Sequence, residues 1–363
     1  MRQTDDYEDH SGGLPIIYMA LGVSVFILAV MGLVIATNKK PKRNLPLIPQ
    51  ETSTENNELS VDDYLSSKRT ADDLDIWDMY PRETEIEPIE GHTETQEETT
   101  TEEASTEASL DDGNHIHIEY SDGSDEWVAI NPYLPKNTYD YTNLISSDGR
   151  LKYYSNGRQI SSLGVDISRY QKNVDFYLLK QDGIDFVMLR VGARGYKSGE
   201  LQLDEYFIEN IKKASEAGLQ IGLYVYSQAI TVDEALAEAQ LILNNIGEYK
   251  ITYPIAIDME FVENDSARVE TLTRDERTAI IGAFVNKIRE AKYTPMIYGN
   301  TEWLVKRIDL SKFTDCCIWL SEETDMPKYP YQYELWQYST KGQVNGIDGY
   351  VNLNLSFIDY SAR

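Results

Sequence analysis

The chain of 363 residues contains very little histidine or cysteine, and the positions of these residues exclude several kinds of chemistry. All four histidines lie within the first 117 residues. The chain beyond that point therefore has no Ser-His or Cys-His hydrolase site and no zinc site with histidine ligands. His115 and His117 are interpreted as a surface pair rather than a metal site. The 2 cysteines, Cys316 and Cys317, are adjacent, and we expect both thiols to pack in the core.

Positive charge is also scarce, since 33 basic residues face 61 acidic ones and the net charge is −28. The acidity is concentrated in residues 44–130, which hold 25 acidic and 3 basic residues. Residues 131–363 carry a net charge of only −7. No basic patch of the kind that binds phosphate backbones is present, so nucleic acid is not an expected partner.

One long hydrophobic run interrupts this polar composition. Ile16–Ala36 is an uncharged stretch of 21 residues, long enough to span a bilayer as a helix. No small-residue cleavage site follows it, which predicts an uncleaved signal anchor after a short tail of residues 1–15. Basic residues cluster at 39–43, and the positive-inside rule would keep the C-terminal part in the cytoplasm. Long domains translocate regardless of such charges, and we expect this one outside the cell.

Three further regions follow the predicted anchor. Residues 37–114 are rich in Glu, Asp, Thr and Ser, which predicts a disordered acidic tether. Residues 115–161 are expected to form a small β extension, with a hairpin at Asn156-Gly157. Residues 162–363 form the main domain.

The main domain alternates short apolar runs with amphipathic helices, as βα units do. Thr231-x-x-Glu234 opens a predicted helix over Val232–Ile246, and Thr273-x-x-Glu276 opens another that ends near Ala291. After Leu310 the connections become too short for full helices. We predict a TIM-like β/α barrel, closed so that no strand edge is exposed, with the last helices reduced or absent. The eight predicted strands are Leu163–Ile167, Phe186–Val191, Gln220–Tyr226, Tyr253–Asp258, Pro295–Tyr298, Cys316–Leu320, Glu334–Gln337 and Tyr350–Leu353.

In such barrels the chemistry lies at the C-terminal ends of the strands. The residues there are acidic, aromatic or amide-bearing, with no phosphate loop and no lysine suited to a Schiff base. Carboxylates and amides bind hydroxyl and acetamido groups, and aromatic rings stack on sugars, which favours a carbohydrate site over simple core packing. The residues are Asp166, Arg190, Tyr226, Asp258 with Glu260, Tyr298, Trp319, Gln337 and Asn352.

Asp258 and Glu260 are the most informative pair in this set. Alternate side chains of a strand point to the same face, so both carboxyl groups face one way while Met259 faces the other. Two residues advance roughly 6.5–7 Å along a strand. One acid of such a pair donates a proton to a glycosidic oxygen, and the other stabilises the positive charge that develops on the sugar. Taken alone, an Asp-x-Glu is more often a strand that runs into an acidic loop.

Five motifs occur in an order that resembles the glycoside hydrolase family 25 lysozymes. They are Gly164-Val-Asp-Ile-Ser-Arg-Tyr-Gln171, Asp185-Phe-Val-Met-Leu-Arg-Val-Gly192, Gly222-Leu-Tyr-Val-Tyr-Ser227, Pro254-Ile-Ala-Ile-Asp-Met-Glu260 and Leu335-Trp-Gln-Tyr338. The resemblance covers about Ser162 to Ser361.

The resemblance implies hydrolysis, without a metal or cofactor, of the β-1,4 bond between N-acetylmuramic acid and N-acetylglucosamine in peptidoglycan glycan strands. It makes Glu260 the general acid, Asp258 the residue that assists the substrate acetamido group, and Asp166 a third site acid. Arg190, Tyr226, Tyr298, Trp319, Gln337 and Asn352 are the expected substrate-binding residues.

One departure from the family pattern bears on activity. Val351-Asn352-Leu353-Asn354 has Asn352 where the family usually has aspartate, so one site carboxylate is missing. A weakly active or inactive barrel that binds glycan strands is therefore an alternative. Cleavage of another acetamido-containing polysaccharide is a further one.

Overall fold

The computed structural model describes residues 113–120, 123–247, 249–262 and 265–360. Within these ranges no helix has the length and apolar character needed to cross a membrane. The predicted span Ile16–Ala36 and nearly all of the predicted acidic tether lie outside the described residues.

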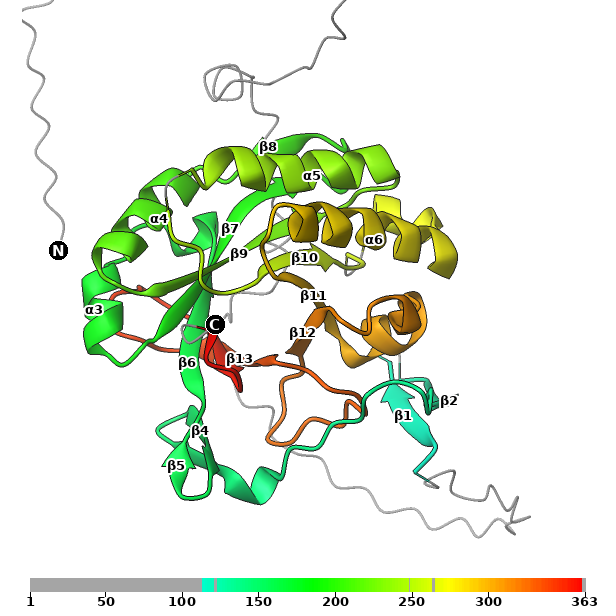
Figure 1. Cartoon of the computed structure of the whole chain (residues 1–363), viewed down its shortest axis with the longest axis horizontal. Helices are drawn as coiled ribbons and strands as arrows, with labels where there is room; N and C mark the ends of the chain where they lie inside the picture. Colours follow the sequence, from blue (N-terminus) through cyan, green and yellow to red (C-terminus); the bar gives the residue numbers. More distant parts are fainter. Residues whose placement is uncertain (1–112, 121–122, 248, 263–264, 361–363) are drawn as a thin grey trace, which may run out of the picture. The chain divides into compact units, whose positions relative to one another are not determined.

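A closed ring of eight strands forms the centre of the main domain (Figure 1). Pairing between the first and second strands of the ring closes it, and a short strand, β8 (Leu201–Leu203), pairs with β7 outside it. All eight predicted strands are present. They are β6 (Ser162–Ile167), β7 (Phe186–Arg194), β9 (Gln220–Ser227), β10 (Ile255–Met259), β11 (Pro295–Asn300), β12 (Cys317–Ser321), β13 (Leu335–Gly342) and β14 (Val351–Ser356).

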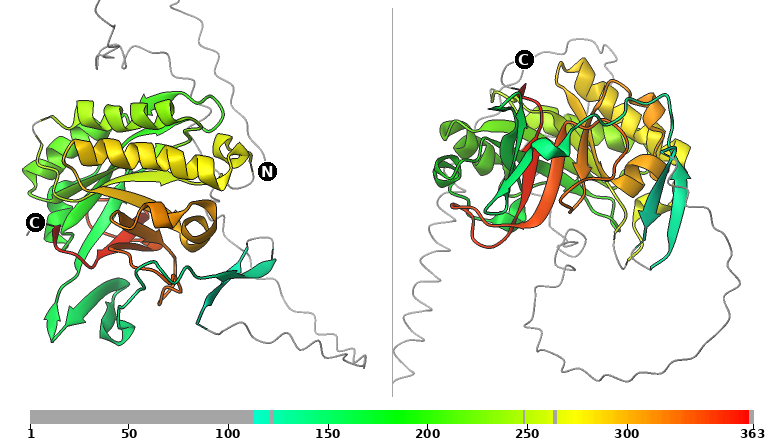
Figure 2. Two further views of the ribbon diagram at one scale, coloured as in Figure 1. Left: turned by 45° about the vertical axis from the view of Figure 1, so that its right-hand side comes forward. Right: turned by 90° about the horizontal axis from the view of Figure 1, so that it is seen from below.

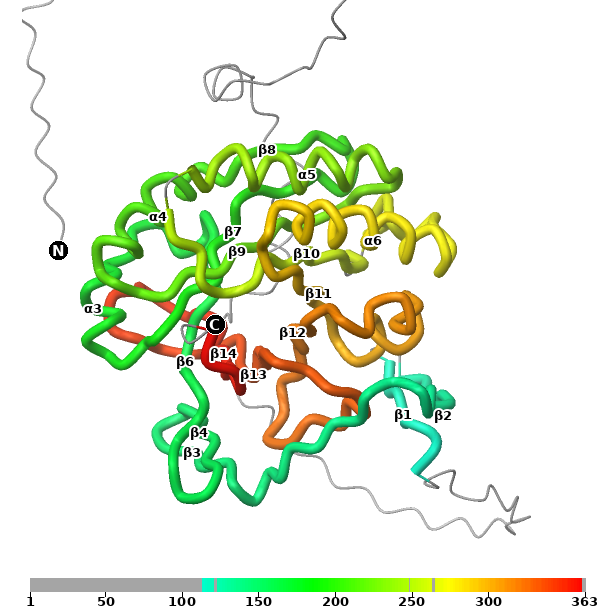
Figure 3. The backbone as a smooth tube through the Cα atoms, viewed as in Figure 1, coloured from blue at the N-terminus to red at the C-terminus, as the bar shows by residue number. Residues whose placement is uncertain are grey.

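The prediction of a TIM-like barrel is only partly correct, because the ring is mixed. Seven strands of the ring, all except β14, run parallel to one another. β14 runs antiparallel to both of its neighbours, β13 and β6. Figure 3 shows β14 between these two strands. The N-terminal part of β14 therefore lies at the end of the barrel where the other strands have their C-termini.

Four α-helices cover one side of the barrel: α3 (Phe176–Gln181), α4 (Phe207–Glu216), α5 (Val232–Asn245) and α6 (Arg274–Glu290) (Figure 2). Both predicted helix starts are correct. The Thr231 hydroxyl accepts a hydrogen bond from the backbone N–H of Glu234, and Thr273 forms a full capping box with Glu276. After β11 the described connections hold only short helical turns, at Trp303–Arg307 and Leu310–Lys312.

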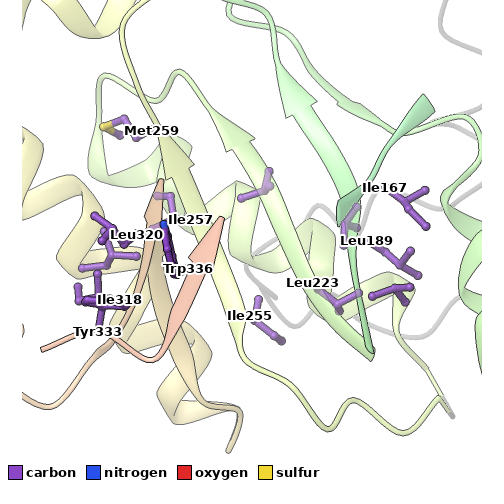
Figure 4. Close-up of a cluster of buried hydrophobic side chains, with 14 of the residues drawn as sticks. Ile167, Leu189, Leu223, Ile255, Ile257, Met259, Ile318, Leu320, Tyr333 and Trp336 are labelled. Atoms are coloured by element: carbon purple, nitrogen blue, oxygen red, sulfur yellow. The ribbon is translucent and has the colours of Figure 1, made fainter. Parts of the chain in front are cut away.

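The barrel strands are buried on both faces. Outward-facing side chains pack beneath the helices and loops, and Figure 4 shows several of them, among them Ile257, Leu320 and Trp336. A second apolar cluster extends from Phe186 and Met188 to Tyr298 and Trp319, two of the predicted site residues. Gly164 leaves room for the ring of Phe186, since a β-carbon there would lie 2.3 Å from it. This apolar packing inside the barrel supports the polar residues of the predicted site.

The N-terminal extension consists of two small sheets. β1 (His115–Glu119) pairs with β2 (Asp125–Ala129), and β4 (Arg150–Ser155) pairs with β3 (Leu144–Ser147) and β5 (Arg158–Gln159). The predicted hairpin is present, with positive φ at both Asn156 and Gly157, as a type I′ turn requires. In Figure 1 the β3–β5 sheet lies on the side of the barrel opposite α5 and α6.

Candidate active site

The predicted site residues come together at one end of the barrel. Strand register places Asp258 between Tyr226 of β9 and Tyr298 of β11, and it places Asn352 opposite Asp166. Hydrogen bonds join side chains from β6, β11, β12, β13 and β14 in this region. The alternation along each strand therefore turns these polar groups toward the barrel interior.

Asp166 lies at the centre of this polar group, 8% exposed. Its Oδ1 accepts a hydrogen bond from Nδ2 of Asn352 at 3.0 Å. Its Oδ2 accepts from Nε2 of Gln337 at 3.0 Å and from Nδ2 of Asn354 at 2.9 Å. Burial raises the pKa of Asp166 to about 6, although the three amide donors lower it. The carboxylate is thus stabilised by neutral donors rather than by a cation.

The direction of these hydrogen bonds is fixed by groups farther out. The indole Nε1 of Trp319 can only donate, and it donates to Oδ1 of Asn354 at 2.8 Å. The amide nitrogen of Asn354 must then face Asp166. Likewise the hydroxyls of Tyr298 and Ser321 lie 3.0 Å and 3.1 Å from Oε1 of Gln337. The amides of Asn354 and Gln337 therefore offer N–H groups to Asp166, which acts as the acceptor.

Asp258 is in a different environment, although it is equally buried. Its Oδ1 is shielded from solvent and has no hydrogen-bond partner among the described residues. Burial raises its pKa well above the usual range, and the negative charges of Glu260 and Asp166 raise it further. The guanidinium of Arg190 acts in the opposite direction. Burial and these two negative charges therefore favour the protonated form of Asp258.

Glu260 follows the last residue of β10 and is only partly buried. Its backbone carbonyl accepts a hydrogen bond from Nε2 of Gln228 at 2.8 Å. Glu260 is thus more exposed than Asp258, which is 6% exposed and lies two residues earlier on the chain.

Arg190 is buried in the barrel and forms an ion pair with Asp204. Its Nε and Nη2 both lie 2.9 Å from Oδ2 of Asp204, and both residues are 5% exposed. The guanidinium also lies 5.0 Å from the ring centre of Tyr170. The same Asp204 oxygen accepts from the backbone N–H of Arg169, which ties the loop after β6 to the barrel. These contacts anchor Arg190 to Asp204 and Tyr170, and its role in substrate binding stays a prediction.

Four site residues were not predicted from the sequence: Asn354, Ser321, Gln228 and Asp204. Asn354 is two residues from Asn352, so the alternation of a strand was sufficient to place both on one face. Asp204 and Gln228 lie in connecting loops, where no periodic pattern indicates a position. Within the described ranges, no group of three or more His, Cys, Asp and Glu side chains is arranged to hold a metal ion.

A family model matches the part of the chain that forms this barrel. The model for "Glycosyl hydrolases family 25" matches residues 165–347, which is half of the chain and includes most of the predicted site. The chain belongs to glycosyl hydrolases family 25. The family match begins inside β6, so the extension of residues 115–161 lies outside it.

Individual relatives are distant. The chain is 26% identical over 192 residues to an "Autolytic lysozyme" of Clostridium acetobutylicum, in a match that covers 53% of this chain and 54% of that protein. It thus spans about half of the length of this relative. It is also 24% identical over 195 residues to "Uncharacterized protein YegX" of Escherichia coli K12, in a match that covers 53% of this chain and 68% of that protein.

Two solved structures are similar to the chain at a comparable level. One is a family 25 glycosyl hydrolase from Bacillus anthracis, at 20% identity and a TM-score of 0.46, with coverage of 59% of this chain and 96% of that one. The other is the autolysin LytC from Streptococcus pneumoniae with a synthetic peptidoglycan ligand. It has 21% identity and a TM-score of 0.49, and the match covers 67% of this chain and 56% of that one.

The substitution Asn352→Asp is expected to shift the pH dependence of this family 25 site. Asp166 takes up a proton as the pH falls through about 6, and an O–H then faces three N–H donors. We therefore expect wild-type activity to fall below that pH. Asn352→Asp replaces one donor with a like charge 3.0 Å away, and both changes raise the pKa of Asp166.

The decline should accordingly begin at a higher pH in the variant, with a modest change in rate near neutral pH. Activity profiles between pH 4 and 8 would measure this. An inactive wild-type protein that gains activity only through Asn352→Asp would contradict our account of the site.

Proposed function

We propose that this chain is a lysozyme-type glycoside hydrolase that cleaves peptidoglycan. The bond is the β-1,4 linkage between N-acetylmuramic acid and N-acetylglucosamine. Family membership and the autolytic lysozyme among the relatives support this assignment. The observation that carries it is the carboxyl pair at the end of β10, in which Asp258 is buried with a raised pKa and Glu260 is more exposed.

Glycosidic cleavage needs one proton for the leaving oxygen and one negative charge beside the sugar, and a pair of acids that shares a single proton supplies both. We assign delivery of the proton to Glu260, because its carboxyl is the more accessible of the two. Asp258, left ionised, orients the substrate acetamido group and stabilises the positive charge. The raised pKa of Asp258 favours retention of one proton on the pair.

The proposed reaction takes place in two steps. In the first, the C1–oxygen bond breaks while Glu260 protonates the leaving oxygen and the substrate acetamido oxygen bonds to C1. In the second, a water molecule attacks C1, the acetamido oxygen leaves, and Glu260 takes the proton of the water. The carboxyl pair thereby regains its single proton. The amides around Asp166 hold a second fixed negative charge near the reacting sugar.

The decisive experiment measures new reducing ends. The purified chain should release them from bacterial peptidoglycan, and the products should carry N-acetylmuramic acid at their reducing termini. Release from chitin with none from peptidoglycan would change the substrate class. Retention on peptidoglycan without any cleavage would favour a second candidate, a glycan-binding module. Asn352, an amide in place of the usual family aspartate, is the observation that motivates that candidate.

We further propose that the hydrolase is anchored to the membrane through Ile16–Ala36 with its barrel outside the cell. Peptidoglycan lies outside the membrane, and the hydrophobic run has the length of a membrane span. Protease added to intact cells should therefore remove the barrel from the cell surface. Full protection in intact cells, with digestion only after lysis, would place the barrel in the cytoplasm.

A further inference from the structure

The parallel pairing of β9 with β10 ends immediately before Glu260. Asp258 pairs with Tyr226 and Met259 with Ser227, and there the register stops. Asp258 is consequently held on both sides, by β9 and by β11. Glu260 lies one residue beyond this support, so a separate interaction must fix its backbone.

Gln228, the residue that follows β9, supplies such an interaction. Its side chain is completely buried, and its Nε2 donates to the backbone carbonyl of Glu260 at 2.8 Å. The same nitrogen donates to the hydroxyl of Tyr226 at 3.0 Å. A side-chain amide thus takes the place of the next backbone N–H in the ladder. The contact between β9 and β10 extends by one residue, as far as Glu260.

Gln228 is itself held in place by charged residues. Its backbone carbonyl accepts from Nη1 of Arg268 at 3.2 Å, and Nη2 of Arg268 lies 2.8 Å from Oε1 of Glu234. The other oxygen of Glu234 accepts from the backbone N–H of Ile230, two residues after Gln228. Arg194 donates to the backbone carbonyl of Glu234 at 2.9 Å. The loop after β9 is therefore braced against α5 and the turn at Arg268–Thr271.

A buried amide is costly when its hydrogen bonds are incomplete. Oε1 of Gln228 is shielded from solvent and has no partner among the described residues. Methionine or leucine would fill a similar volume without that cost. The hydrogen bond from Nε2 of Gln228 to the backbone carbonyl of Glu260 therefore explains why an amide occupies this position.

We propose that Gln228 is a positioning residue that fixes the backbone of Glu260 and thereby the distance between its carboxyl group and Asp258. This inference rests on the proposed function, in which Glu260 delivers the proton. Gln228 itself does not touch the substrate. A displacement of about 1 Å at a reacting group can lower a rate about 100-fold, so the effect on turnover is measurable.

The substitution Gln228→Met keeps the size of the side chain and removes the donor. We expect kcat to fall about 10- to 100-fold while KM changes less than about two-fold. Gln220→Met is the matched control, since Gln220 begins the same strand at the opposite end of the barrel and also has a buried Oε1 without a partner. Equal kcat values for the two variants would overturn the proposal.

A second variant separates the hydrogen bond from general damage to the fold. Gln228→Glu offers no donor when ionised, but its protonated carboxyl can donate an O–H to the carbonyl of Glu260. The ionisable residues that face position 228 are Tyr226 and Glu260, with Arg268 and Glu234 against its loop and Asp258 two residues before Glu260, and the variant shares all of them with the wild type. The ratio of variant to wild-type kcat should therefore rise as the pH falls. A ratio that is constant with pH would overturn the proposal.

A readout independent of activity covers the case in which the wild type does not cleave peptidoglycan. Hydrogen exchange followed by mass spectrometry should show faster exchange over residues 258–262 in Gln228→Met, and no such change in Gln220→Met. Unchanged exchange there would overturn the positioning role. A wild type that is inactive on peptidoglycan, with the exchange difference present, would overturn only the proposed function.

Discussion

Replacing Glu260 with glutamine should lower the rate of glycan cleavage about 100- to 10,000-fold, the range that a general acid contributes. Glutamine keeps the shape of the side chain and has no proton to give to the leaving oxygen. The negative charge of Glu260 also helps to raise the pKa of Asp258. The variant should therefore lose the proton donor and also lower the pKa of Asp258 toward its ordinary value.

The measurement is kcat from the release of reducing ends, with peptidoglycan binding measured in parallel. Binding should persist, because the aromatic and amide groups of the site are unchanged. Glu290→Gln is the matched control: Glu290 is exposed and ends α6 at the far end of the barrel from the site. Full activity in Glu260→Gln would mean that another group delivers the proton. Loss of activity together with loss of binding would mean that the substitution damaged the site as a whole.

The positions of the barrel strands followed from their apolar runs, because strands buried on both faces are nearly continuous in hydrophobic residues. The direction of β14 could not be predicted from its apolar run. The predicted strands ended at Gln337 and resumed at Tyr350, which leaves room for a parallel crossover of about a dozen residues. In the structure β13 continues to Gly342, and the connection to Val351 is too short for such a crossover. β13 continues past its apolar residues into the polar Ser339-Thr340-Lys341, so the antiparallel hairpin of β13 and β14 could not be predicted from hydrophobicity.

Asn352 lies at the site for a reason different from the predicted one. It was assigned to the C-terminal end of a parallel strand, whereas it lies near the start of an antiparallel strand that enters the barrel at the same end. Asp258 and Asp166 were placed correctly because their strands do run parallel. The buried amides and the ion pair of Arg190 with Asp204 depend on side-chain packing between distant segments, which residue spacing does not reveal.

The extension is more closely integrated with the barrel than its sequence indicates. The ring of Tyr139 stacks on Phe357 at 4.0 Å between centroids, and it meets Tyr333 and Tyr153 edge-on. Its hydroxyl donates to the backbone carbonyl of Tyr333 at 2.7 Å. Leu151 also belongs to the main apolar core. These contacts join the extension to residues that flank β13 and β14, and Leu151 also donates its backbone N–H to the hydroxyl of Tyr338 in β13.

Removal of residues 113–161 should therefore prevent stable folding of the barrel, although the family match begins only at residue 165. Truncation would expose Tyr338 of β13, which is 7% exposed and contacts Gly149 and Leu151 of the extension, together with Phe357 and Tyr333. An exposed apolar face of this kind leads to aggregation. A chain that begins at residue 113 is the control and should remain soluble. Equal solubility and equal unfolding transitions for the two truncations would show that the extension is a separate module.

A point substitution tests the same contact without changing the length of the chain. Tyr139→Ala removes the stacked ring and its hydrogen bond, and it should lower the free energy of unfolding by about 3 kcal/mol. Tyr133→Ala is the matched control, because Tyr133 lies in the same segment and is 91% exposed, so its loss should change stability by less than about 0.5 kcal/mol. Urea unfolding measures both. Similar values for the two variants would mean that the aromatic contact contributes little. A large difference would extend the hydrolase fold N-terminally beyond its family boundary.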